Sequence, residues 1–292
     1  MAYRFKRSER VSDGVRRIAL EQVERALNDI NQPEGNSDTV AHQLRKRFKK
    51  LRGLLRLIRE AIPDLYHSEN AWFRDQAREL SKLRDAEAFV EAVERLKPNC
   101  QTQSDHDALN HRLEQLREQR DDIANDVVDL EQTLGTLSRD LSDTRKRIQN
   151  WNLKKVTQKN VWRGFAKTYE RGKTDLTICL KSPTAEHFHE WRKRVKYHWY
   201  HIRLLSGAWP RVVKSRAKEL KRLGDLLGDD HDLSVLRGWF KQTDDAKAGK
   251  RLISERQKNL QQEALSLGER IYAESPEVIT ERFQRYFKIW RK

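Results

Sequence analysis

The sequence contains little cysteine and no long apolar run. Only Cys100 and Cys179 occur in 292 residues, so a disulfide framework or a cysteine-rich zinc site is excluded and a reducing compartment is favoured. No stretch approaches the roughly 18 uncharged apolar residues of a membrane span. The first ten residues, MAYRFKRSER, lack the apolar segment of a secretory signal. We therefore expect a cytoplasmic protein that does not enter a membrane.

Positive charge, in contrast, is in excess. The chain has 60 lysines and arginines against 44 acidic residues, which gives a formal net charge of +16. Such an excess indicates a polyanionic partner, either nucleic acid, acidic lipid or a phosphate polymer. Composition alone does not choose among these three.

Apolar residues recur at helical spacing, and no segment alternates as a strand would. Residues Leu44, Phe48, Leu51 and Leu55, for example, share one face of a helix. The six prolines, with nearby Gly, Asn and Ser, mark the ends of such segments. The pattern predicts an all-α chain.

The segment 105–150 carries apolar residues in alternating steps of three and four, together with an acidic stretch. This heptad seam predicts one long helix. It is a candidate surface for a homodimer or a protein partner. A bundle helix with a packed apolar edge has the same seam geometry, and we favour that interpretation.

The sequence also contains an internal repeat. A shift of 147 residues aligns many landmarks without a gap. The aligned pairs include His42 with His189, Arg45 with Arg192, Lys46 with Lys193, Lys49 with Lys196, Arg56 with Arg203, Pro63 with Pro210, and Asp85 with Asp232. We expect two helical bundle repeats, 1–150 and 151–292, related by a pseudo-two-fold axis.

A basic stripe occurs in each copy of the repeat. On a helix the stripe residues fall within roughly 80° of one another, opposite an apolar face. In the first copy they are His42, Arg45, Lys49, Arg52 and Arg56, flanked by Lys46. In the second copy they are His189, Arg192, Lys196 and Arg203, flanked by Lys193.

A run of charge is often only a solvated helix face, but the first stripe contains no acid between His42 and Arg59. Like charges at this spacing repel each other, and the pattern is kept in both copies. Both observations favour an anion-binding surface. The histidine of each stripe can donate a hydrogen bond to a phosphate.

A second repeated element pairs a cation with an aspartate, as Arg84-Asp85 and as His231-Asp232. The cation extends the anion site, and the aspartate either orients a basic side chain through a charge-assisted hydrogen bond or forms a surface ion pair. A metal site at 228–232 is disfavoured, because the corresponding residues 81–84 contain no set of ligands.

The duplicated H-x-x-R-K-x-x-K element, followed by (R/H)-D, resembles the CHAD domain, the conserved histidine α-helical domain. This resemblance implies two four-helix bundles facing each other across a basic central cleft or pore. It also implies binding of inorganic polyphosphate without any reaction, cofactor or metal, and a location at polyphosphate granules. The implied ligands are the residues of both stripes with their flanking lysines, together with Arg84 and His231, with Asp85 and Asp232 as orienting residues.

The second copy departs from the first, with Trp199 in place of Arg52 and Tyr197 in place of Lys50. These aromatic residues, with Tyr200, keep single-stranded nucleic acid as an alternative ligand. A metal-dependent HD-type phosphohydrolase is a second alternative, based on His189 and His231-Asp232. It is disfavoured because the neighbouring cations would repel a divalent metal.

Overall fold

The computed structural model describes residues 3–35, 37–80, 84–125, 127–239 and 246–292. Side chains are described in these ranges except at 37–38, 84–88, 119–125, 127–131, 239 and 246–247. The described backbone forms eleven α-helices and two short 3-10 helices, and it contains no strand. The predicted all-α class is confirmed. None of the helices described is long and apolar enough to cross a membrane.

The first group of helices surrounds α2. Helix α2 packs against α1 and α3, and α6 packs against α1. Their bounds are Val11–Asn31 for α1, Ser37–Ile58 for α2, Pro63–Glu79 for α3 and Val127–Gln149 for α6. Proline occupies the first position of α3, where its missing N–H costs no helical hydrogen bond.

The second group surrounds α8. Helix α8 packs against α7 and α9, α10 packs against α9, and α11 packs against α7. Their bounds are Gln158–Lys181 for α7, Ala185–Leu204 for α8, Pro210–Trp239 for α9, Ala246–Ile271 for α10 and Pro276–Arg291 for α11. Proline again begins α9 and α11, as the punctuation of the sequence predicts.

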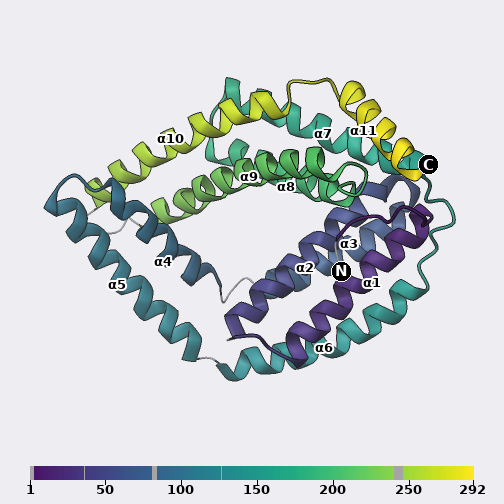
Figure 1. Cartoon of the computed structure of the whole chain (residues 1–292). Helices are drawn as coiled ribbons and strands as arrows, with labels where there is room; N and C mark the ends of the chain where they lie inside the picture. Colours follow the sequence, from purple (N-terminus) through teal and green to yellow (C-terminus); the bar gives the residue numbers. More distant parts are fainter. Residues whose placement is uncertain (1–2, 36, 81–83, 126, 240–245) are drawn as a thin grey trace.

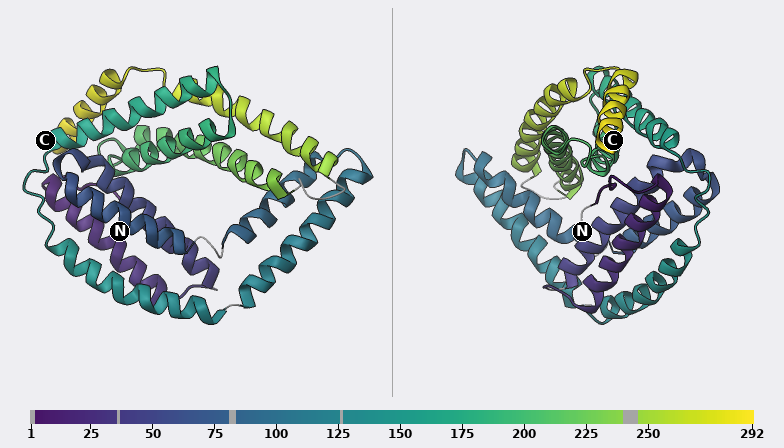
Figure 2. Two further views of the ribbon diagram at one scale, coloured as in Figure 1. Left: turned by 180° about the vertical axis from the view of Figure 1, so that it is seen from behind. Right: turned by 45° about the vertical axis from the view of Figure 1, so that its right-hand side comes forward.

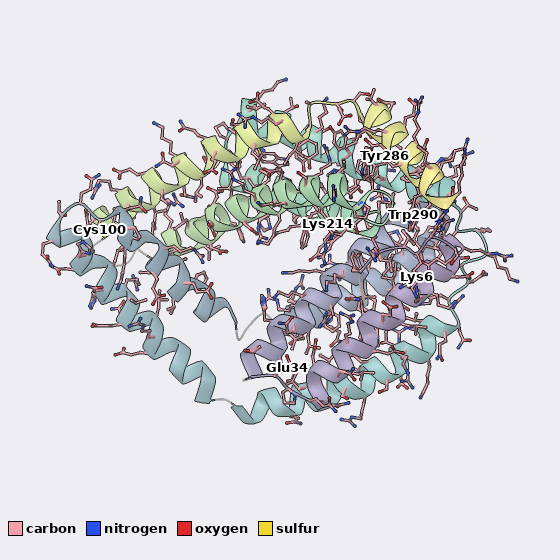
Figure 3. All side chains as sticks on the ribbon, in the orientation of Figure 1. Lys6, Glu34, Cys100, Lys214, Tyr286 and Trp290 are labelled. Atoms are coloured by element: carbon pink, nitrogen blue, oxygen red, sulfur yellow. The ribbon has the colours of Figure 1, made fainter. Side chains whose placement is uncertain are left out.

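Helices α4 (Arg84–Leu96) and α5 (Gln103–Asn125) lie apart from the first group. They pack against each other and against α9 and α10. The helices as a whole form a closed loop, in which α2 meets α7 and α8 on one side while α4 and α5 meet α9 and α10 on the other (Figures 1 and 2). Cys100 and Lys6 lie at opposite ends of the view in Figure 3.

The prediction of a single long helix over 105–150 is wrong. Helices α5 and α6 run in different directions (Figure 1) and pack against different partners. Leu109, Leu113 and Leu116 of α5 are buried with residues of α9 and α10. Leu137 and Leu141 of α6 belong to the main core instead. The predicted apolar residues are buried, but those of α5 and those of α6 pack into two different cores.

Two hydrophobic clusters hold the fold together. The main cluster joins the helices around α2 with those around α8 and includes Phe48, Phe73, Trp191 and Phe283. The smaller cluster joins α4 and α5 to α9 and α10, through residues such as Val93. Each cluster therefore draws side chains from both 1–150 and 151–292.

Candidate functional site

Helix α2 separates its apolar and basic residues as its sequence predicts. Leu44, Phe48, Leu51 and Leu55 are fully buried. On the opposite side His42, Arg45, Arg52 and Arg56 are half-buried, while Lys46 and Lys49 are exposed. The apolar face fixes the rotation of the helix, and so fixes the direction in which the basic stripe points.

Helix α8 repeats this arrangement. Its packing residues Trp191, Val195 and Ile202 are fully buried. Its stripe residues are all half-buried, and they are His189, Arg192, Lys193, Lys196 and Arg203. Helix α8 begins with a side-chain cap, since the Thr184 hydroxyl accepts a hydrogen bond from the backbone N–H of His187.

Helices α2 and α8 meet at Gly53. A Cβ atom at this position would lie 2.9 Å from the Cβ of Tyr200, so only glycine allows the approach. Beside it, the Nε2 of His201 lies 3.0 Å from the carbonyl oxygen of Gly53. Gly53 and Tyr200 are equivalent positions under the 147-residue shift. The contact brings the two basic helices together.

Lysine 49 experiences the charges of both helices. The pKa of Lys49 is lowered to about 7, first because the surrounding protein limits its hydration and then by repulsion from Arg45, Arg192, Lys196 and Arg52. Two of these cations come from α2 and two from α8. The structure therefore brings together residues of both predicted stripes.

Helix α9 packs against the basic stripe of α8. Gly224 lies against Lys196, where an added Cβ would come within 3.1 Å of the lysine Cε. One turn later Gly228 lies against Arg192, at 3.4 Å from its Nε. The Lys196 ammonium is 3.4 Å from an oxygen of Asp225. The two glycines thus leave room for long cationic side chains that cross α9.

The last arginine of each stripe lies over aromatic rings. The Cζ atom of Arg56 is 4.0 Å from the ring centre of Tyr197. The Cζ atom of Arg203 is 4.6 Å from the ring centre of Trp199 and 5.6 Å from that of Tyr3. These distances are those of cation–π contacts. Arg52, by contrast, donates a hydrogen bond from Nε to Asn70 at 3.1 Å.

The two histidines of the second copy form a close pair, with their ring planes inclined by 38°. The ring centres of His189 and His231 are 4.0 Å apart. Burial lowers the pKa of His231 to about 4, with further repulsion from His189, Arg192 and Lys193. The pKa of His189 is lowered in the same direction, mainly by burial. Both shifts favour the neutral form of the rings, in which each ring can donate one hydrogen bond.

Other predicted residues have partners that the sequence did not indicate. Asp232 accepts a hydrogen bond from Arg95 of α4 at 3.4 Å. Lys193 forms an ion pair with Glu190, one turn earlier on α8. The side chains of Arg84 and Asp85 lie outside the described residues, so their predicted roles in the first copy stay predictions.

A comparison with protein families identifies the chain. Residues 18–241 match the family model of the CHAD domain. The chain belongs to the CHAD domain family. The matched region of this CHAD protein contains both basic helices and both cation-aspartate elements, and it ends before α10 and α11. No curated protein matches the sequence significantly.

Several residues that contact the candidate site were not predicted from the sequence. Gly224 and Gly228 carry a signal, since two glycines one turn apart inside a helix indicate a close approach of another group. Asp225 and Arg95 carry none, because their contacts depend on how α4, α8 and α9 pack. Among the residues with described side chains, no group of three or more His, Cys, Asp or Glu is placed to hold a metal ion.

Proposed function

We propose that this CHAD protein binds inorganic polyphosphate in a basic cleft between α2 and α8, without acting on it. The observation that carries the proposal is the close contact between the two basic helices, where a Cβ at Gly53 would lie 2.9 Å from the Cβ of Tyr200 and Arg56 lies over the ring of Tyr197. Cations of both stripes therefore gather near Lys49, whose pKa is lowered to about 7, first by desolvation and then by Arg45, Arg192, Lys196 and Arg52. Such a gathering of like charges favours an anionic ligand.

We further propose that the halves 1–150 and 151–292 are tandem bundle repeats facing each other across a pseudo-two-fold axis. Reciprocal contacts support this. Arg56 lies over Tyr197, and the equivalent Arg203 lowers the pKa of Lys50, after burial and Arg47. Under the shift of 147 residues, Arg56 corresponds to Arg203 and Lys50 to Tyr197. Such exchanged contacts are the mark of a two-fold interface. The cleft would lie along this axis.

The ligand must neutralise many cations, and it needs no nucleobases to do so. Arginine makes forked hydrogen bonds to phosphate oxygens, and lysine supplies a mobile point charge. Stripe residues on two helices can therefore contact successive phosphates of a flexible polymer. Each contact is weak, so the affinity rises with polymer length until the cleft is filled. It falls with salt concentration through release of counterions.

Single-stranded nucleic acid fits the site less well. Its binding depends on aromatic rings on which bases stack. Here Arg56 covers Tyr197 and Arg203 covers Trp199, while Tyr200 is only 7% exposed. The aromatic rings near the stripe are already engaged by the protein's own arginines. A polyanion without bases needs no such platform.

A metal-dependent phosphohydrolase is also disfavoured by the donors present. The paired rings of His189 and His231 have Arg192 and Lys193 as charged neighbours, and Asp232 pairs with Arg95. Cations at these positions would repel a divalent metal. We therefore propose binding without catalysis and without a cofactor, in the cytoplasm and at polyphosphate granules. Because most described leucines of 105–150 are buried inside the chain and Leu134 is partly buried, a homodimer or protein partner there would use mainly the polar faces of α5 and α6.

Charge reversal tests the proposal. Two double variants, Arg45→Glu with Lys49→Glu and Arg192→Glu with Lys196→Glu, should each lose retention on immobilised long-chain polyphosphate. The matched control, Arg285→Glu with Lys288→Glu on α11, changes net charge equally at exposed positions and should be retained like the wild type. Retention of both stripe variants, with unchanged helical spectra, would contradict the proposed site.

A further inference from the structure

A second basic cavity lies among α9, α10 and α11. Its volume is about 570 Å³, within the range of pockets that hold small ligands. Four arginines line it, Arg216 and Arg222 from α9, Arg270 from α10 and Arg282 from α11, together with Glu219. Two further carboxylates, Glu263 and Glu274, pair with three of these arginines. None of these residues belongs to the basic stripes of α2 and α8.

Three of the four arginines are held in place by contacts with the protein. Arg216 donates from Nη2 to the carbonyl oxygen of Ile271 at 2.7 Å. Arg282 pairs with Glu274 at 2.5 Å, and the same carboxylate lies 3.9 Å from Arg216. Arg222 pairs with Glu263 at 2.5 Å. One carboxylate is thus shared by two guanidinium groups that both line the cavity.

The rest of the cavity wall is apolar and aromatic. Phe283 and Tyr286 contribute rings from α11, and Leu267 and Ile271 contribute aliphatic side chains from α10. The ring centres of Phe283 and Tyr286 are 5.8 Å apart. Tyr286 is labelled on α11 in Figure 3. A ligand that fills this space would place an apolar body beside the rings and an anion beside the arginines.

The first half of the chain does not carry this feature. Under the 147-residue shift, Arg216 corresponds to Glu69 and Arg222 to Asp75, so the charge is inverted at both positions. Glu69 is buried and pairs with Arg147 at 2.7 Å. Helices α10 and α11 also lie beyond the matched region 18–241. The cavity is therefore a property of the second half of this chain.

We propose that the cavity binds a small organic phosphate with an aromatic body. Phosphate is favoured over carboxylate because its three terminal oxygens can accept from several guanidinium groups, whereas a carboxylate is satisfied by one fork. The aromatic body would pack against Tyr286 and Phe283. This site goes beyond polyphosphate binding and does not depend on it, since the two sites share no residue.

Equilibrium dialysis with 1-naphthyl phosphate tests the site. The wild type should bind one molecule saturably, and 1-naphthol or inorganic phosphate alone should bind at least tenfold more weakly. The double variant Arg270→Glu with Arg282→Gln should lose at least tenfold in affinity. The Arg285→Glu, Lys288→Glu control on α11 should bind within twofold of the wild type, because neither residue lines the cavity.

A second variant distinguishes loss of binding from a folding defect. Tyr286→Ala leaves all four arginines in place and should still weaken binding of 1-naphthyl phosphate severalfold. The Arg45→Glu, Lys49→Glu variant should bind the probe like the wild type, which separates this site from the polyphosphate site. Absence of saturable binding to the wild type, or equal binding by all variants, would overturn the proposal. Displacement of the probe from the Arg45→Glu, Lys49→Glu variant by inorganic polyphosphate would also overturn it.

Discussion

Gly53 and Tyr200, which are 147 residues apart in the sequence, meet at the contact between α2 and α8. A Cβ at Gly53 would lie 2.9 Å from the Cβ of Tyr200. This approach is what brings cations of both helices around Lys49. The packing at this contact therefore supports the proposed polyphosphate site, and the packing and the charges can be perturbed by separate substitutions.

Substitution of Gly53 by alanine should destabilise the protein. The new methyl would overlap Tyr200, and overpacking of this kind costs about 1–3 kcal/mol. Thermal unfolding followed by circular dichroism measures the loss. Gly135→Ala on α6 is the control, because nothing lies within 4 Å of its added Cβ, and an exposed helical alanine should stabilise by about 0.5–1 kcal/mol. Equal melting temperatures for the two variants would contradict the close contact.

Gly224 should act as a positioning residue for Lys196. An alanine there would approach the lysine Cε to 3.1 Å and shift the ammonium group away from its place in the stripe. We expect polyphosphate affinity to fall severalfold while the melting temperature changes little. Gly238→Ala on the same helix has open space around it and should bind like the wild type. Equal affinities for the two alanine variants in a titration with labelled polyphosphate would argue against this role.

Polyphosphate affinity should fall as the pH rises above 7. The pKa of Lys49 is lowered to about 7 in the unbound protein, and a bound polyanion favours the charged form, so binding takes up a proton above that pH. Below about pH 7 Lys49 is already charged and adds no such dependence. Lys49→Arg stays protonated throughout, and its affinity should vary less between pH 7 and 9. Identical pH profiles for wild type and variant would show that Lys49 does not titrate in the site.

Removal of the Lys49 charge should stabilise the protein while weakening binding. A lysine whose folded-state pKa is depressed opposes folding at pH values below its unfolded pKa, and this cost is relieved as the pH rises through the interval between the two values. Lys49→Gln should therefore melt at a higher temperature at pH 6, with a smaller gain at pH 9. A lower melting temperature at both pH values would indicate that the charge is compensated in the unbound protein.

The sequence predicted what depends on helix periodicity. The burial of Leu44, Phe48 and Trp191 follows from their spacing, and so does the position of the basic stripes on the opposite faces. Local pattern was sufficient here because an amphipathic helix has only one way to bury its apolar face.

Which helices pack against one another could not be predicted in the same way. The heptad leucines of 105–150 indicated packing but not that Leu113 and Leu141 would join different cores, because either helix could bury the same edge against several partners. The pairing of Lys196 with Asp225 and of Asp232 with Arg95 depends on neighbouring helices. The sequence likewise gave no sign of the arginine-lined cavity, because its residues come from three helices and show no common spacing.

The central claim is that cations of α2 and α8 hold one polymer between them. A crystal structure of the protein with bound polyphosphate tests this most directly. We predict a continuous chain of phosphate density that contacts Lys49 from α2 and Lys196 from α8. Density confined to another surface, with the two lysines contacting no phosphate, would contradict the account.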